Sequence, residues 1–230
     1  QLVQHPRLHS YIVTARGRGL NSSPSGPALV AGLGCAALAN AAGRALLQSQ
    51  FQRVVFASAA APVLPLRDFD ATMVSLREDT VARTLHASGS IPFVLAGEQN
   101  IAGAPPGHYW DGGIIDYHFD MQPFREETLI LYPHFRGDVT PGWFDKFLYW
   151  RKNRRPSMDK LILICPSAAF LASLPQGKIP DRSDFRRMTA QERLNYWKIC
   201  IDRSRELAED FARQISRKDP LADTILLDPG

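Results

Sequence analysis

Short apolar runs, separated by helical patterns and by Pro- and Gly-rich loops, constrain the fold of this chain more than any other feature. Five runs rich in β-branched and aromatic residues are predicted to be strands, at 10–15, 53–57, 108–110, 128–132 and 160–165. The last two are apolar almost throughout, which is typical of parallel strands that are covered on both faces. Because strands alternate with helices, we expect an α/β fold, a three-layer αβα sandwich around a mainly parallel sheet.

Three helices are predicted between and after these strands, at 28–50, 70–88 and 189–216. The first is rich in alanine, but its three glycines argue against one unbroken helix. The second has Asp70 as a candidate N-cap residue and ends where glycine and proline follow it. Its approximate apolar stripe consists of Met73, Leu76, Val81 and Leu85. In folds of this class, sites lie at the carboxyl ends of strands.

Composition excludes several classes of protein. The net charge of +4 over 230 residues is too small to indicate a nucleic-acid partner. The three cysteines, Cys35, Cys165 and Cys200, are too few and too scattered for a disulfide framework or a zinc site, so we expect reduced thiols. No run reaches the ~18 apolar residues that a membrane span needs. With no secretory signal visible, we expect a cytoplasmic protein.

The charges are distributed unevenly along the chain. Residues 1–67 contain six arginines and no acidic residue, and the first carboxylate is Asp68. Such an asymmetry can mark a surface that faces phosphate or anionic lipid. Alternatively, the balancing acids lie on a neighbouring part of the protein, and we favour this second explanation.

Two short motifs follow each other in a characteristic order. A predicted helix ends in Ser88-Gly89-Ser90-Ile91-Pro92, and a later strand runs into Tyr109-Trp110-Asp111-Gly112-Gly113. With one strand before and another after them, this order resembles the patatin-like acyl hydrolases over residues 10–132. The resemblance implies a lipid acyl hydrolase that cleaves esters of phospholipids or acylglycerols with a Ser-Asp dyad and without a cofactor.

The resemblance assigns the dyad aspartate to Asp111. A serine hydroxyl is a poor nucleophile until a base within hydrogen-bonding reach takes its proton, and a carboxylate at the end of a rigid strand can be that base. Gly112 and Gly113 leave room for substrate and can adopt backbone angles that a Cβ would forbid. The competing explanation is that Asp111 and Gly112 form an ordinary surface turn.

The chain also departs from the family pattern. It contains no Gly-x-Ser-x-Gly elbow and no glycine-rich oxyanion loop, both of which precede the matched segments in the family. We therefore expect residues 1–137 to be the C-terminal part of a patatin-like catalytic domain without its N-terminal strands. Residues 138–230 would be its α/β continuation and a C-terminal helical extension.

The missing elbow makes two further expectations necessary. The nucleophile and the missing strands would come from an N-terminal part of the same protein, or a second copy would cover the open sheet edge. The 230 residues alone would then have no acyl-hydrolase activity. The alternative function is a non-catalytic patatin-like module that binds lipid or acts as a scaffold.

Other polar side chains are weaker candidates. Asp116, His118 and Asp120 alternate and would share one face of a strand, as ligands of a metal ion do, but no further cluster completes such a site. We favour a solvated face for these three residues and expect no metal.

Serines and histidines near the two motifs have structural explanations. Ser88 and Ser90 could be nucleophiles only if a base pointed at them, and we expect them to cap the helix end or line an acyl pocket. His108 and His134 flank predicted strands and are expected to be hydrogen-bonded structural residues.

Residues 143–155 join aromatic side chains to a basic tail. A helix would place Trp143, Phe147 and Trp150 on one side, a pattern typical of peripheral membrane contact. The basic residues that follow are Arg151, Lys152, Arg154 and Arg155. An amphipathic helix buried against the sheet explains the aromatic spacing equally simply, and we favour it.

Overall fold

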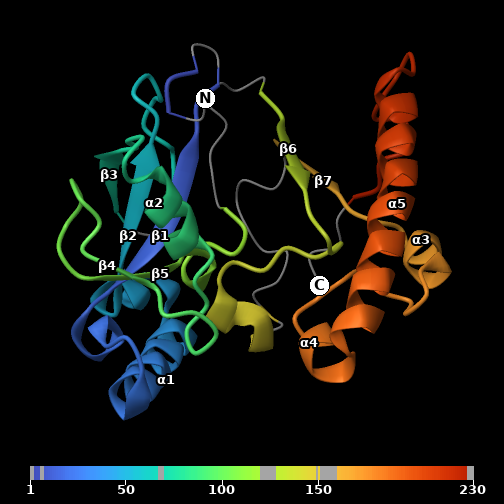
Figure 1. Ribbon diagram of the computed structural model, residues 1–230. Helices are drawn as coiled ribbons and strands as arrows, with labels where there is room; N and C mark the ends of the chain where they lie inside the picture. The colour runs from blue at the N-terminus through green and yellow to red at the C-terminus, as the bar shows by residue number, and fades with distance from the viewer. Residues whose placement is uncertain are drawn as a thin grey trace. The chain divides into compact units, whose positions relative to one another are not determined.

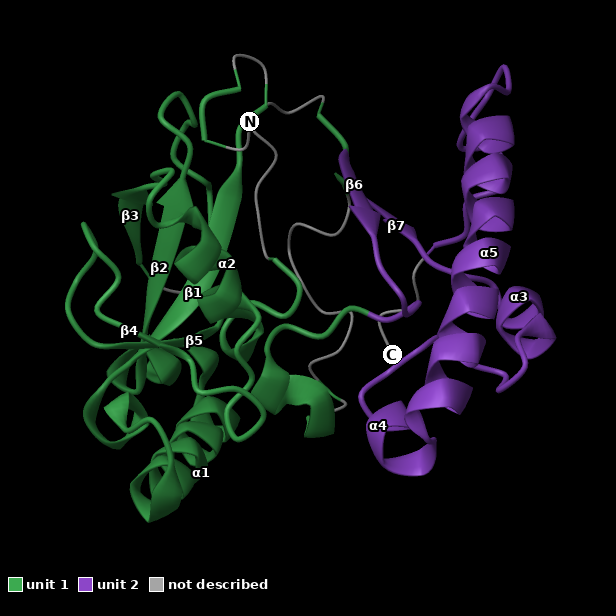
Figure 2. Cartoon of the chain, in the orientation of Figure 1, with its two compact units in different colours: residues 1–129, 139–160, 229–230 green, residues 130–138, 161–228 purple. Residues whose placement is uncertain are grey.

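The computed structural model describes residues 3–5, 8–66, 70–119, 128–148, 150 and 160–226. The chain forms two compact units (Figure 2). Unit 1 comprises residues 1–129, 139–160 and 229–230, and unit 2 comprises residues 130–138 and 161–228. No helix within the described ranges has the length and apolar character needed to cross a membrane.

Unit 1 contains a five-stranded sheet with the order β3-β2-β1-β5-β4. The strands are β1 (Tyr11–Gly17), β2 (Phe51–Ala57), β3 (Ala71–Ser75), β4 (Glu98–Gln99) and β5 (His108–Asp111). Only β2 and β3 pair in parallel within this sheet, and its other three pairings are antiparallel. The protein is therefore α/β as expected, but the expectation of a mainly parallel sheet is corrected to a mixed one. Apolar patterns identify strands without fixing their direction, and β2 begins opposite the residue at which β1 ends.

Helices pack on both faces of this sheet. Successive side chains of a strand point to opposite faces, and apolar side chains lie on each of them. α1 (Gly26–Ala42) packs on the face that carries Ala15 and Trp110, and α2 (Val81–Ser88) packs on the face that carries Tyr109 (Figure 1). The cluster on the α1 side consists of Ala15, Leu29, Leu33, Ala36, Leu47, Phe51, Trp110, Ile114 and Ile115. The cluster on the α2 side consists of Ile12, Val54, Phe56, Leu76, Ala87, Ile101 and Tyr109.

The expected helix at 28–50 is two elements. α1 ends at Ala42, Gly43 is extended, and the 3-10 helix η2 (Arg44–Ser49) follows. The expectation that glycine interrupts this segment is therefore confirmed. Among the described residues, further 3-10 helices include η1 (Gly19–Ser22), η3 (Gly112–Ile114) and η4 (Trp143–Phe147).

The expected helix at 70–88 is wrong in its first half. Strand β3 begins there and pairs with β2, and α2 starts only at Val81. Met73 and Leu76 fit a helical stripe, but a few apolar residues do not distinguish a helix from a strand. Pairing with a neighbouring strand decides the conformation here, because β-structure depends on tertiary partners. The end of α2 at Ser88 agrees with the prediction.

Unit 2 contains a two-stranded sheet and three helices. β6 (Ile130–Pro133) and β7 (Leu161–Ile164) pair in parallel, as predicted. Both strands are half-buried or exposed, so the expectation of full burial is wrong for them. The helices are α3 (Ala168–Ser173), α4 (Asp184–Arg187) and α5 (Ala190–Ile215).

The long C-terminal helix is confirmed as α5. Its N-terminus has a capping box, in which the Thr189 hydroxyl accepts from the Glu192 backbone N–H and the Glu192 carboxylate accepts from the Thr189 backbone N–H. Tyr196 and Cys200 of α5 pack with Leu174 in the core of unit 2.

Candidate functional site

Asp111 is the last residue of β5 and lies at the carboxyl end of that strand, as predicted. Its backbone N–H donates to the Ser90 carbonyl over 3.0 Å, which joins the two sequence motifs in space. Its side chain is half-buried and accepts a hydrogen bond of 2.7 Å from the Gly113 N–H. The carboxylate therefore caps η3 and is held by its own turn.

Burial raises the pKa of the Asp111 carboxyl above its ordinary value. The Gly113 N–H and the positive charge of Lys146 act in the opposite direction, but they do not cancel the effect of burial. A carboxylate with a raised pKa is a stronger base than an exposed one, and a carboxylate that acts as a general base needs this property.

Space, rather than backbone angle, restricts the two positions after Asp111. Neither has a positive φ, so the expectation of angles forbidden to other residues is wrong. A Cβ on Gly112 would lie 2.3 Å from the Val13 carbonyl oxygen, and a Cβ on Gly113 would lie 3.0 Å from Asp111 Oδ1. Close approach of β1, rather than conformation, excludes a side chain at Gly112.

Ser88 and Ser90 have structural partners. The Ser88 hydroxyl donates to the Val13 carbonyl over 2.7 Å, and the Ser90 hydroxyl donates to the His86 carbonyl over 2.7 Å. Ser90 is fully buried and satisfies a carbonyl at the end of α2, which agrees with the helix-capping explanation. Neither hydroxyl is directed at the Asp111 carboxylate by these bonds.

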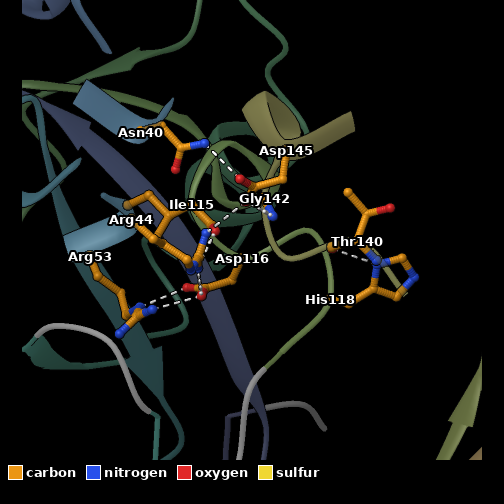
Figure 3. A network of polar contacts seen from close by, with 9 residues as sticks. All are labelled: Asn40, Arg44, Arg53, Ile115, Asp116, His118, Thr140, Gly142 and Asp145. Atoms are coloured by element: carbon orange, nitrogen blue, oxygen red, sulfur yellow. Dashed lines mark hydrogen bonds and ion pairs between the residues drawn. The ribbon is translucent and has the colours of Figure 1, made fainter. Parts of the chain in front are cut away.

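Buried charged side chains form a network around Asp116, a few residues after Asp111 in the sequence (Figure 3). Both oxygens of Asp116 accept from Arg53, each over 2.7 Å, and Asp116 Oδ1 also lies 3.2 Å from Arg44 Nη2. The same Arg44 nitrogen donates to the Ile115 carbonyl over 2.7 Å. Arg53 and Asp116 are almost completely buried, so this pairing ties the segment after Asp111 to β2.

Asp145 of η4 extends this network. It accepts from Asn40 Nδ2 over 2.7 Å and from the Gly142 N–H over 2.9 Å, and its Oδ2 lies 3.5 Å from Arg44 Nη1 (Figure 3). Sequence reasoning did not identify these residues as a group. The signal was the acid-free start of the chain, because Arg44 and Arg53 are balanced by acids from later segments.

The structure does not support a metal site at Asp116, His118 and Asp120. Asp116 is held by two arginines, and no group of three or more potential ligands occurs among the residues that the structure describes. Asp120 lies outside them. Asp116 and His118 are both buried, so the expectation of a solvated face is wrong for these two residues. His118 Nδ1 lies 3.0 Å from the Thr140 N and 2.8 Å from the Thr140 carbonyl oxygen.

The other histidines have structural contacts. His108 Nε2 lies 2.8 Å from the Ala96 carbonyl oxygen, and burial lowers the pKa of this ring. His134 Nδ1 accepts from the Arg136 N–H over 3.1 Å. The structural roles expected for both residues agree with these bonds.

The aromatic segment is shorter than predicted. η4 covers five residues, from Trp143 to Phe147, and is a 3-10 helix rather than an amphipathic α-helix. Phe144 packs against the core on the α1 side, whereas Phe147 is 85% exposed and Trp150 is 49% exposed. The basic residues of the predicted membrane contact, Arg151, Lys152, Arg154 and Arg155, lie outside the described residues.

Comparison of the chain with models of protein families, with curated proteins and with solved structures finds no match.

Proposed function

We propose that this chain carries the dyad aspartate, Asp111, of a patatin-like lipid acyl hydrolase with a three-layer αβα catalytic domain. The observation that carries the proposal is the state of the Asp111 carboxylate. It lies at the carboxyl end of a buried strand and is raised in pKa by burial. In the part of the chain that the structure describes, one N–H donates to its side chain. It therefore retains acceptor positions for a further donor such as a serine hydroxyl.

The chemistry would begin with Asp111 accepting the proton of a serine hydroxyl as the oxygen attacks the ester carbonyl. An acyl-enzyme would form, and the alcohol of the lipid would leave with that proton. Water would then attack the acyl-enzyme and lose a proton to Asp111, which would pass it to the serine oxygen as the bond to the acyl group breaks and the fatty acid leaves. Because the pKa of the carboxyl is raised, the proton transfer in each step is favoured over transfer to an exposed carboxylate.

The nucleophile of this proposal belongs to a polypeptide segment outside these 230 residues, since their sequence has no Gly-x-Ser-x-Gly elbow. It would come from an N-terminal part of the same protein, because a second copy of these residues has the same sequence and could cover the open sheet edge but not supply the elbow. Ser88 and Ser90 are unsuitable, because their hydroxyls already donate to backbone carbonyls.

Ester hydrolysis by the natural protein, expressed from its complete gene, tests the proposal. Turnover of a fluorogenic ester and of phosphatidylcholine vesicles should fall about 10²–10⁴-fold in Asp111→Asn, the range for loss of a general base. The matched control is Asp79→Asn, which removes an exposed carboxylate paired with Arg77 in the same unit. Unchanged turnover in Asp111→Asn would refute the proposal.

The alternative is a module that keeps the fold and binds lipid without hydrolysing it, and the absence of the elbow from this sequence favours it. In that case the natural protein hydrolyses neither substrate, and Asp111→Asn leaves its binding to lipid vesicles unchanged. We also propose the lipid contact for Phe147 and Trp150, which expose aromatic surface of the kind that inserts at a membrane interface.

A further inference from the structure

Buried charges fasten η4, a segment distant in sequence, to the residues that follow Asp111. Asp145 of η4 is completely buried and is bound by Asn40, by the Gly142 N–H and by Arg44. Arg44 also binds Asp116, which lies five residues after Asp111 in the sequence (Figure 3). Hydrogen bonds and ion pairs therefore connect η4 to the segment that follows the candidate base.

The residue after Asp145 contacts an aromatic ring close to this turn. Lys146 Nζ lies 3.9 Å from the centroid of the Tyr117 ring, a distance typical of a cation–π contact. Tyr117 in turn adjoins Gly113, because a Cβ on Gly113 would lie 3.3 Å from Tyr117 Cδ2 and 3.0 Å from Asp111 Oδ1. The ring that holds Lys146 and the carboxylate of Asp111 thus meet at one glycine.

We propose that Lys146 is a positioning residue of this site: it follows the anchored Asp145, its ammonium is held on the ring of Tyr117, which like Asp111 adjoins Gly113, and it keeps the carboxylate charged. The placement stands by itself, whereas its catalytic meaning rests on the proposed function. A buried carboxylate favours its neutral form, and a neutral acid cannot take a proton from serine. A cation held nearby offsets part of that penalty without bonding to the oxygens that the serine needs.

Other charged side chains near Asp111 are engaged elsewhere. On α2, His86 Nδ1 lies 2.9 Å from Glu98 Oε1. On β1, Arg16 donates to the Pro106 carbonyl and to Gln52. Arg44 and Arg53 are bound by the network carboxylates. Among the described residues, Lys146 is the charged side chain whose field acts on Asp111, and it lowers the pKa of that carboxyl.

Carboxyl titration by NMR tests the proposal without any assay of activity. The natural protein is labelled with carboxyl-¹³C aspartate, and the Asp111 resonance is identified as the one that Asp111→Asn removes. In Lys146→Gln we expect its pKa to rise above the wild-type value. Arg77→Gln, which removes an equal charge from an exposed ion pair with Asp79 in the same unit, should leave it unchanged. The same Asp111 pKa in Lys146→Gln and wild type would overturn the proposal.

The role of the network is tested with Asp145→Asn, which keeps the shape of the side chain and removes its charge. If the network fixes Lys146, this variant also raises the Asp111 pKa, and adding Lys146→Gln produces no further rise. If Asp145→Asn does not fold, Lys146→Arg replaces it, because retaining a cation should keep the Asp111 pKa close to wild type. A Lys146→Arg titration identical to that of Lys146→Gln would contradict a role for the charge.

The role of Lys146 in catalysis is tested separately, by the pH dependence of ester hydrolysis. If the natural protein hydrolyses esters through Asp111, the acidic limb of its pH profile should move upward in Lys146→Gln together with the NMR pKa. A shifted NMR pKa with turnover that does not depend on Asp111 would refute the proposed function and leave the placement of Lys146 intact. An unshifted NMR pKa would refute the placement whatever the activity.

Discussion

Asp111 in unit 1 is half-buried and Asp184 in unit 2 is completely buried, and their surroundings have opposite net effects on the carboxyl pKa. Asp184 is completely buried and accepts from Lys178 Nζ over 2.6 Å, from the Asp181 N–H over 3.0 Å and from Trp197 Nε1 over 3.0 Å. Burial acts to raise the pKa of Asp184, but these donors outweigh it and the pKa is lowered. Asp184 is the first residue of α4, where a negative charge is favourable, and it holds the turn before this helix through the Asp181 N–H.

Asp111 has a different balance. Burial dominates, its pKa is raised, and the described part of the chain supplies one N–H donor to its carboxylate, from Gly113. A carboxylate that serves the fold is saturated with donors, as Asp184 and Asp116 are. One that serves chemistry must keep oxygens available and a pKa that permits proton uptake. The contrast separates the candidate base from the structural acids.

The largest effect should come from breaking a saturated acid. Arg53→Met leaves Asp116 buried with Arg44 as its remaining cation among the described residues, and we expect a loss of about 3–5 kcal/mol in the free energy of unfolding. The matched change in unit 2, Lys178→Met, should cost less, because Lys178 is partly exposed and Asp184 keeps two other donors. Urea unfolding measures both. Equal losses would mean that the remaining donors and the partial exposure of Lys178 do not reduce the cost of leaving Asp184 without its cation.

The glycine next to the base should give the second effect. Gly112→Ala would put a Cβ 2.3 Å from the Val13 carbonyl oxygen, and displacing that strand should cost about 1–3 kcal/mol. Gly34→Ala is the control, since Gly34 is exposed on α1 with open space around it and the change should stabilise by about 0.5–1 kcal/mol. Thermal unfolding would contradict this account if both substitutions stabilised the protein.

The smallest effects should differ in sign between the two aspartates. The lowered pKa of Asp184 contributes stability that is present above its unfolded-state pKa and is lost as the pH falls through its folded-state pKa. The raised pKa of Asp111 imposes a cost above its folded-state pKa that disappears below its unfolded-state pKa. At pH 7, Asp184→Asn should therefore destabilise by about 1 kcal/mol, and Asp111→Asn should stabilise.

This pair of substitutions also has a pH control. Both differences from wild type should shrink towards zero as the pH falls below the ordinary range of aspartate pKa values, because the wild-type carboxyls then become neutral. Melting curves collected across acid and neutral pH would reveal it. Stabilisation by Asp184→Asn at pH 7 would remove the contrast on which this account depends.

Local features were predictable from the sequence, and tertiary partners were not. The spacing of apolar residues identified α5, and the strand before Asp111 was recognised from its aromatic residues. The direction of β2 was not predictable, because an apolar strand has the same pattern in either direction. Likewise β3 depends on its pairing with β2, which no local pattern records.

The candidate site divides in the same way. The Asp-Gly-Gly motif identified Asp111, whose capping bond to Gly113 is local. The network could not be predicted in detail, because Arg53 and Asp116 are 63 residues apart and Asn40 and Asp145 are 105 apart. Only the lack of acids in residues 1–67 indicated that the early arginines needed partners from elsewhere.

Covalent labelling of the natural protein with a fluorophosphonate tests most directly whether Asp111 is the base of a serine hydrolase. We predict that one serine outside these 230 residues is labelled, that Asp111→Asn slows its labelling about 10²-fold or more, and that Asp79→Asn leaves the rate unchanged. Mapping of the modified peptide identifies the serine. Labelling of Ser90, or labelling at the wild-type rate in Asp111→Asn, would contradict the assignment of Asp111 as the catalytic base.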